Sequence, residues 1–126
     1  MKSLFYCFVF TAGFFAFCSC KKSSNATTDI KSNFVGNWAG AQQFSGVSGS
    51  YKFSLSVNQD NSVVNIDSAF SNQAYPGTYT YTADSLKISY TNGTKWNLKF
   101  SNNYSGCSGT VLGYAGANAI VSMTKK

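Results

Sequence analysis

The chain has 126 residues and a net charge of +6, which is enough sequence for one small domain. Its ten basic residues are all lysines, its four acidic residues are all aspartates, and histidine is missing. Without His, the sequence offers no Ser-His-Asp or Cys-His catalytic group and no His-ligated metal site. Without Glu and Arg, it offers neither a pair of glutamates for glycoside hydrolysis nor a bidentate clamp for phosphate. We therefore expect no enzyme activity, no metal and no cofactor.

The first twenty residues resemble an export signal. A lysine-bearing start is followed by an apolar run from Leu4 to Phe17, which is shorter than the roughly 20 apolar residues of a membrane-spanning helix. The run ends in Phe17-Cys18-Ser19-Cys20, which resembles the lipobox of bacterial lipoproteins. The resemblance implies a signal peptide over 1–19, cleavage before Cys20, and acylation of Cys20, with palmitate as a typical chain. Cys18 is a weaker candidate, because the bulky Phe17 precedes it, and a plain membrane anchor or an ordinary secretory signal is the alternative.

A lipobox places the protein in the bacterial cell envelope, lipid-anchored to the outer membrane and facing the periplasm or the exterior. Residues 20–33 are mostly Ser, Thr, Asn and Lys, so we expect a flexible tether that cannot bury enough apolar surface to fold. With Cys20 acylated and the signal removed, Cys107 is the one remaining thiol, and we expect it to be buried and inert. If Cys20 is not acylated, a Cys20–Cys107 disulfide stays open.

From residue 34 onward, apolar and polar residues alternate with the two-residue period of a β-strand. Short runs separated by turn residues predict an antiparallel meander, because no connection is long enough for a helical crossover. The domain over 34–126 is thus predicted to be all-β with about eight strands, near residues 34–44, 50–58, 62–70, 77–83, 86–92, 95–101, 106–113 and 118–124.

Two dipeptides predict particular turns between these strands. Asn92-Gly93 is typical of a type I′ hairpin, and Pro76-Gly77 suits the centre of a type II turn. Because each strand has one apolar face, the sheet must either close into a barrel or pack as a β-sandwich. Eight up-and-down strands favour the barrel, since closure removes the unpaired edges.

A short motif stands at the start of the predicted domain. Phe34-Val35-Gly36-Asn37-Trp38 matches the Gly-x-Trp signature of the lipocalin and fatty-acid-binding superfamily, so the chain resembles a small bacterial lipocalin-like (calycin-type) lipoprotein. The resemblance implies that Gly36 and Trp38 close one end of a barrel. It also implies that the barrel binds a small ligand. In that family an Arg on the last strands packs over the Trp, and this chain has no Arg.

Aromatic side chains recur on the apolar faces of the predicted strands. We expect them mostly to fill the barrel, and any cavity to open near the loops. The candidate ligand-lining residues are Tyr51, Phe53, Tyr79, Tyr81, Tyr90, Trp96 and Phe100.

The sequence therefore predicts a membrane-anchored protein that binds a small apolar or glycan ligand. The alternative is an envelope interaction or inhibitor protein that has a filled core and uses its outer wall or loops. The membrane is an expected partner through the N-terminal lipid, and a protein partner is open. Nucleic acid is not expected for an exported chain without Arg.

Overall fold

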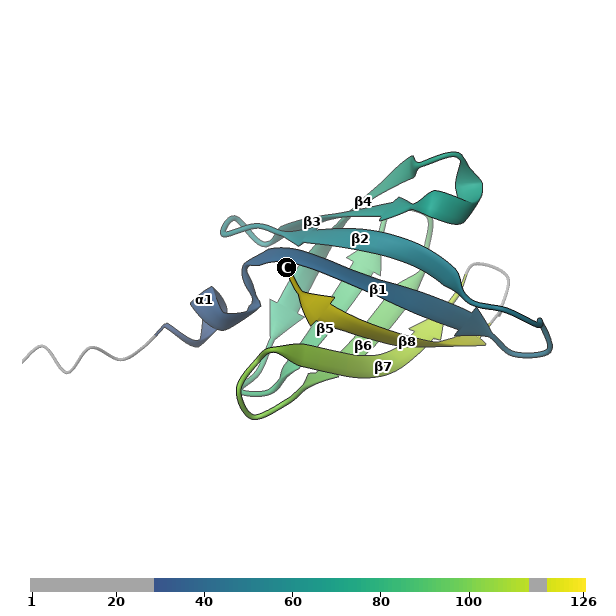
Figure 1. The fold of residues 1–126 in the computed structure, drawn as a ribbon. Helices are drawn as coiled ribbons and strands as arrows, with labels where there is room; N and C mark the ends of the chain where they lie inside the picture. Colours follow the sequence, from purple (N-terminus) through teal and green to yellow (C-terminus); the bar gives the residue numbers. More distant parts are fainter. Residues whose placement is uncertain (1–28, 114–117) are drawn as a thin grey trace, which may run out of the picture.

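The computed structural model describes residues 29–113 and 118–126, and these residues form a β-barrel that is preceded by one short helix (Figure 1). The helix, α1, spans Ile30–Phe34, and a 3-10 turn, η1, spans Ser68–Phe70. The strands are β1 (Gly36–Phe44), β2 (Tyr51–Val57), β3 (Ser62–Asp67), β4 (Gln73–Tyr81), β5 (Ser85–Tyr90), β6 (Lys95–Phe100), β7 (Gly106–Leu112) and β8 (Asn118–Lys125).

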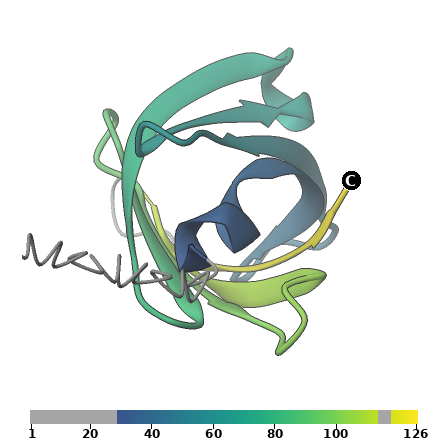
Figure 2. The ribbon, with the colours of Figure 1, turned by 90° about the vertical axis from the view of Figure 1, so that its left-hand side faces the viewer.

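Each strand pairs antiparallel with the next one along the chain, and β8 pairs with β1 to close the barrel. The view along the axis shows this ring of strands, with α1 lying across one opening (Figure 2). The predicted all-β class, the antiparallel meander and the barrel are confirmed, and the β-sandwich alternative is wrong. The signal peptide, Cys18 and Cys20 lie outside the described residues.

The alternation along each strand decides what fills the barrel. Inward positions carry the core, and outward positions are mainly Ser, Thr, Asn and Lys. The largest fully buried side chains are Trp38, Trp96, Phe34, Leu55, Leu86, Ile88, Val57, Val63 and Val121. The aromatic content of the sequence is thus used largely to pack the interior, as expected for a barrel of this strand number.

Three inward positions are glycines, one each on β1, β4 and β7. A Cβ on Gly40 would lie 2.8 Å from the Cζ atom of Phe53, and one on Gly77 would lie 2.9 Å from Cδ1 of Tyr90. A Cβ on Gly109 would overlap the carbonyl oxygen of Asn97 on β6. Glycine at such points lets strands bend sharply and lets a neighbouring chain approach closely.

The connection between β3 and β4 differs from the prediction. β3 ends at Asp67, the chain turns through η1 and the positive-φ residues Ser71 and Asn72, and β4 begins at Gln73. Pro76 and Gly77, predicted as a type II turn, lie inside β4 instead. Pro76 has no N–H to donate, and its nitrogen and carbonyl face the same neighbouring chain. The carbonyl accepts from the Thr91 N–H at 3.2 Å, and Thr91 lies just beyond the end of β5, so the missing donor falls outside the β4–β5 ladder.

Two further predictions need correction. The Asn92-Gly93 loop has a positive φ at Gly93 (86°) but not at Asn92, so it is not a type I′ turn. The Gly93 N–H donates to the Tyr90 carbonyl at 3.0 Å, as in a longer hairpin loop that ends in a left-handed glycine. Residues 30–34, expected to be tether and first strand, form α1 because Asp29 caps the helix and Phe34 is fully buried.

Candidate functional site

One end of the barrel is closed by α1 (Figures 1 and 2). Phe34, the last helical residue, packs edge-on against Phe100 and Tyr104, with ring centroids 4.8 and 5.4 Å away. The Trp38 indole N–H donates to the Phe34 carbonyl at 2.9 Å, and its ring packs edge-on against Phe100 at 5.1 Å. Trp38 is 0% exposed, so this end is a packed plug with no space for a ligand.

A lysine on the last strand lies over that plug. The Nζ atom of Lys125 is 5.5 Å from the centroid of the Trp38 ring and donates to the Asn33 carbonyl at 3.1 Å. Gly36 has a φ of 136°, and a Cβ there would come within 3.0 Å of the Lys125 side chain. Lys125 can therefore supply the cation–π contact over the tryptophan in a chain without arginine.

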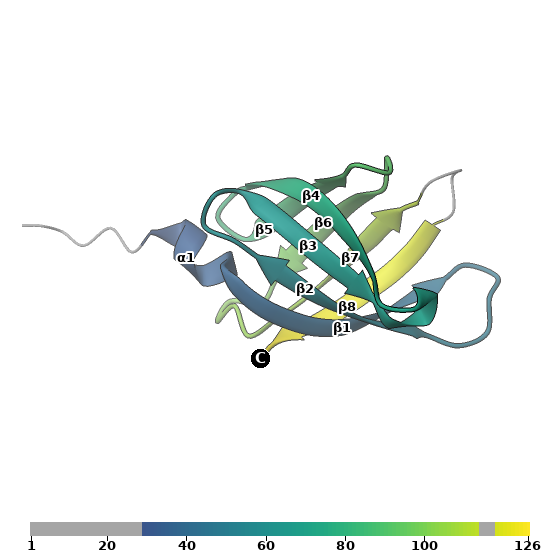
Figure 3. The same ribbon diagram turned by 90° about the horizontal axis from the view of Figure 1, so that it is seen from above.

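The opposite end holds the candidate site. The β1–β2 loop and η1 both lie at the end away from α1 (Figure 3), and a pocket of about 250 Å³ opens between the strand ends there. We call it the mouth pocket. It is lined by Gln42, Phe44, Asn65, Asp67, Phe70, Tyr75, Tyr90, Asn92, Thr94, Trp96, Val111 and Gly113.

Buried polar side chains gather in the mouth pocket. Gln42 on β1 and Asn65 and Asp67 on β3 are 5%, 5% and 3% exposed. The Nε2 atom of Gln42 donates to Oδ2 of Asp67 at 2.7 Å, and the backbone N–H of Ala69 donates to Oδ1 at 2.9 Å. The Asp67 carboxylate therefore joins β1 to the start of η1, and among the described residues that line the pocket it is the one charged side chain.

Two buried polar atoms of the mouth pocket have no hydrogen-bond partner among the described residues. They are the Asn65 Oδ1 atom and the Tyr90 hydroxyl oxygen. An unpaired buried polar atom costs about 1–3 kcal/mol, so such atoms are rare, and a water, an ion or a ligand that hydrogen-bonds to them removes that cost. Burial also raises the pKa of the Tyr90 hydroxyl far above its usual value, which keeps it protonated and able to donate.

Aromatic rings form much of the remaining wall. The Trp96 ring packs edge-on against Tyr90 at 5.5 Å and against Phe53 at 5.0 Å. Tyr75 is partly buried, and Phe70, on η1, is 54% exposed at the rim. The mouth pocket thus combines ring faces with a few fixed polar atoms, the usual make-up of a small-molecule site.

The structure divides the predicted ligand-lining residues between the two ends. Tyr90 and Trp96 line the mouth pocket, while Phe53 is buried beneath it against Trp96. Tyr51, at the start of β2, is partly buried against Phe44, with ring centroids 5.7 Å apart.

The remaining three candidates lie toward the plug. The Tyr79 hydroxyl donates to the Asn58 carbonyl at 2.7 Å, in the β2–β3 loop. Tyr81 is 41% exposed, and Phe100 packs against Phe34. The polar residues Gln42, Asn65 and Asp67 were not among the candidates, because alternation alone does not show which face of a mixed run points inward.

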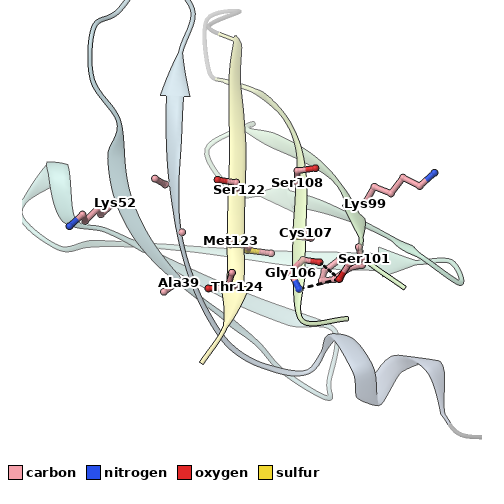
Figure 4. A pocket seen from close by; sticks show the side chains of 13 residues that line it. Ala39, Lys52, Lys99, Ser101, Gly106, Cys107, Ser108, Ser122, Met123 and Thr124 are labelled. Atoms are coloured by element: carbon pink, nitrogen blue, oxygen red, sulfur yellow. Dashed lines mark hydrogen bonds between the residues drawn. The ribbon is translucent and has the colours of Figure 1, made fainter. Parts of the chain in front are cut away.

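The outer wall offers shallower features. A depression over β1, β7 and β8 is floored by small side chains such as Ala39, Ser108 and Ser122, with Lys52 and Lys99 at its sides (Figure 4). Figure 4 shows both lysines extending away from it, so they do not converge on a common ligand. A second depression, near the mouth, is lined by Val47, Leu112 and Ile120, among others, which are 43%, 51% and 68% exposed.

Other kinds of site were also sought. Within residues 29–113 and 118–126, no group of three or more Cys or Asp side chains could hold a metal. Over the same part of the chain, no helix is both long and apolar enough to cross a membrane. Cys107, the one cysteine in the described part of the chain, is buried, and burial raises the pKa of its thiol to about 12.

Known proteins resemble the chain in fold only. No known protein family and no curated protein matches the sequence. A redesigned beta barrel superimposes with a TM-score of 0.60 over 77% of this chain and 95% of its own, at 12% identity. A de novo designed fluorescence-activating beta barrel gives a TM-score of 0.50 over 78% of this chain and 98% of its own, at 10% identity. At these identities the likeness concerns the barrel alone.

Proposed function

We propose that this chain is a lipid-anchored binding protein of the bacterial cell envelope that takes a small ligand into the mouth pocket. The observation that carries the proposal is a pair of unpartnered buried polar atoms, Asn65 Oδ1 and the Tyr90 hydroxyl oxygen, on two residues that line a pocket with aromatic walls. The volume of about 250 Å³ lies just below that of typical drug-sized sites, so the ligand is small. Ring faces and polar atoms together suit an apolar ring or a glycan.

Binding is proposed rather than catalysis. Asp67 is the one carboxylate of the described lining, whereas Asp60 and Asp84 lie in loops at the plugged end and Asp29 caps α1. A general acid and base pair would need two titratable groups within hydrogen-bond reach of the same substrate.

The lipocalin-like resemblance supports the same proposal. Gly36 and Trp38 lie at the plugged end, where the Gly-x-Trp motif implies closure, and Lys125 supplies the cation over the tryptophan. The chain enters the barrel at this end (Figure 1). An acyl group on Cys20 would therefore attach the protein to the membrane through its plugged end, which is the end away from the mouth pocket.

Ligand binding is tested by nuclear magnetic resonance of the two indole N–H groups. Trp96 lines the mouth pocket and Trp38 lies in the plug, so a ligand in the mouth shifts the Trp96 signal and leaves Trp38 unchanged. A small-molecule library of ring compounds and methyl glycosides is screened against the full-length protein in detergent. Thr94→Trp, which fills the rim, should abolish the shift, whereas Thr80→Trp on the exposed face of β4 should not. Hits that move both indoles equally, or that survive Thr94→Trp, would contradict the proposal.

The anchor is tested separately. Cys20→Ala should release the protein from membranes and prevent labelling by radioactive palmitate, and Cys18→Ala should do neither. A Cys20→Ala protein that stays membrane-bound and labelled would show that the anchor is assigned wrongly.

A second candidate function rests on the outer depression beside the mouth. Its exposed Val47, Leu112 and Ile120 could dock a protein of the envelope, such as a hydrolase to be inhibited. A photo-crosslinking residue placed at position 120 in cells should then give one discrete adduct, and the same residue at the exposed position 87 should give none. Equal, diffuse labelling at both positions would count against a specific partner.

A further inference from the structure

Two of the buried side chains that line the mouth pocket, Asp67 and Asn65, have acceptor oxygens that can take further hydrogen bonds. The two Asp67 oxygens each accept one bond, from Gln42 and Ala69, and a carboxylate oxygen can accept a second. The Asn65 Oδ1 atom accepts none from the described residues. The Tyr90 hydroxyl is the one buried, unpartnered group here that can also donate. A ligand group that donates hydrogen bonds therefore suits the acceptor oxygens of Asp67 and Asn65.

The buried Asp67 carboxylate also favours a ligand that carries a positive charge. Asp67 is 3% exposed, and the two described groups that donate hydrogen bonds to its carboxylate, from Gln42 and Ala69, are neutral. The one ion pair among the described residues, Lys99 with Asp84, lies in the exposed surface at the plugged end, with Nζ and Oδ2 3.6 Å apart. A buried carboxylate is ordinarily balanced by a positive charge, and none of the described residues that line this pocket is basic.

The walls fit a cation as well. Trp96, Tyr90 and Tyr75 line the pocket, and the face of an aromatic ring attracts an organic cation placed over it. A primary ammonium group brings three donors and one positive charge in a compact volume.

We propose that the mouth pocket selects a small primary amine carried on a ring-sized apolar group over the uncharged analogue of the same shape. In this arrangement the ammonium group donates to Asp67 and Asn65, and the ring lies against Trp96. The inference rests on the proposed binding function and names the class of its ligand.

The test compares phenethylamine with 2-phenylethanol, which has the same ring and chain but a hydroxyl in place of the amine. Binding to the full-length protein in detergent is measured near pH 7 by titration of the Trp96 indole signal. A hydrogen bond to a charged partner is worth about 1.5–3 kcal/mol, so the amine should bind at least about tenfold more tightly than the alcohol. This comparison in the unaltered protein needs no variant.

Two variants that remove the same charge then locate the effect. Asp67→Asn should reduce the preference for the amine to less than about twofold, with Gln42 able to rotate its amide and keep the pair hydrogen-bonded. Asp84→Asn, on the exposed surface at the plugged end, should leave the tenfold preference intact. Loss of the preference in both variants would mean that overall charge, not the mouth, attracts the amine, and would overturn the inference.

The remaining outcomes separate this inference from the proposed function. Equal affinity for amine and alcohol, with a Trp96 shift for both, overturns the cation preference and leaves the binding function standing. A shift with methyl glucoside but with neither phenethyl probe does the same. If no probe and no library compound shifts Trp96, both the inference and the proposed function fail.

Discussion

Tyr79 and Tyr90 provide a stability test in which one substitution should have opposite effects. Both residues are buried, 3% and 6% exposed, and both lose only a hydroxyl on replacement by Phe. The Tyr79 hydroxyl donates to the Asn58 carbonyl at 2.7 Å, whereas the Tyr90 hydroxyl has no partner among the described residues. Tyr90→Phe should therefore stabilise the ligand-free protein, and Tyr79→Phe should destabilise it.

The magnitudes follow from the two environments. Removing an unpaired buried hydroxyl recovers about 1–2 kcal/mol of its desolvation penalty, and removing a paired one loses about 1 kcal/mol. For a domain of this size, 1 kcal/mol shifts the Tm by about 4–8 °C. Thermal unfolding followed by circular dichroism should therefore separate the two variants by roughly 8 °C or more. The same Tyr90→Phe change should weaken ligand binding, because the hydroxyl is kept for the ligand and not for the fold.

A result in which Tyr90→Phe lowers the Tm as much as Tyr79→Phe would refute this reasoning. It would show that the Tyr90 hydroxyl is already satisfied in the ligand-free protein. Of the two unpartnered atoms on which the proposed function rests, only Asn65 Oδ1 would then remain.

Three further predictions concern the rest of the barrel. Gly109→Ala should destabilise the protein by about 1–3 kcal/mol in denaturant unfolding, because the added Cβ overlaps the backbone of β6. Gly106→Ala, whose Cβ would lie 3.4 Å from its nearest neighbour, should be tolerated. Phe34→Ala should lower the free energy of unfolding by about 3–5 kcal/mol and lower the Tm, because it removes the fully buried ring of the plug. An unchanged Tm would mean that α1 does not close the barrel. Burial raises the pKa of Cys107 in the folded protein from a usual value of 9.0 to about 12, so the thiol ionises first in the unfolded chain. The free energy of unfolding should therefore fall as the pH rises from about 9 to about 12. The fall should be less steep in Cys107→Ala. Peptide mapping after iodoacetamide treatment near pH 8 should likewise show Cys107 unlabelled until the protein is unfolded, and rapid native labelling would contradict its burial.

The strands were predictable from the sequence because most of them alternate cleanly. In β6, for example, Trp96, Leu98 and Phe100 can face only one way, and the structure buries all three. Closure was also predictable, since an even meander of short strands with one apolar face has unpaired edges that a barrel removes.

The polar residues of the mouth pocket were not predictable, although its place near the loops and two of its aromatic residues, Tyr90 and Trp96, were, and β3 shows why. Its sequence Val63-Val64-Asn65-Ile66-Asp67 has apolar residues on both faces, so alternation allows either face to point inward. The pairing of β2 with β3 decides the matter, because it places Val63, Asn65 and Asp67 opposite the inward residues of β2. Ile66, which is the more hydrophobic choice for the interior, is left 38% exposed.

The helix was missed for a related reason. Five residues are too few to show a helical period. The helix α1 depends on the Asp29 cap and on the Phe34 ring, which is buried only once the barrel has closed. Pro76 led to a wrong prediction of a turn inside β4. The effect of a proline in a strand depends on whether the neighbouring strand, here β5, extends as far as the proline.

The even number of strands brings both ends of the described chain to the plugged end of the barrel. The backbone N–H of Lys126 donates to the Asn37 carbonyl at 2.9 Å, beside the point where α1 leads into β1. A tag or reporter fused after Lys126 would therefore emerge on the side away from the mouth pocket. A protein immobilised through such a tag would be held at its plugged end, with the mouth pocket at the end that faces the solution.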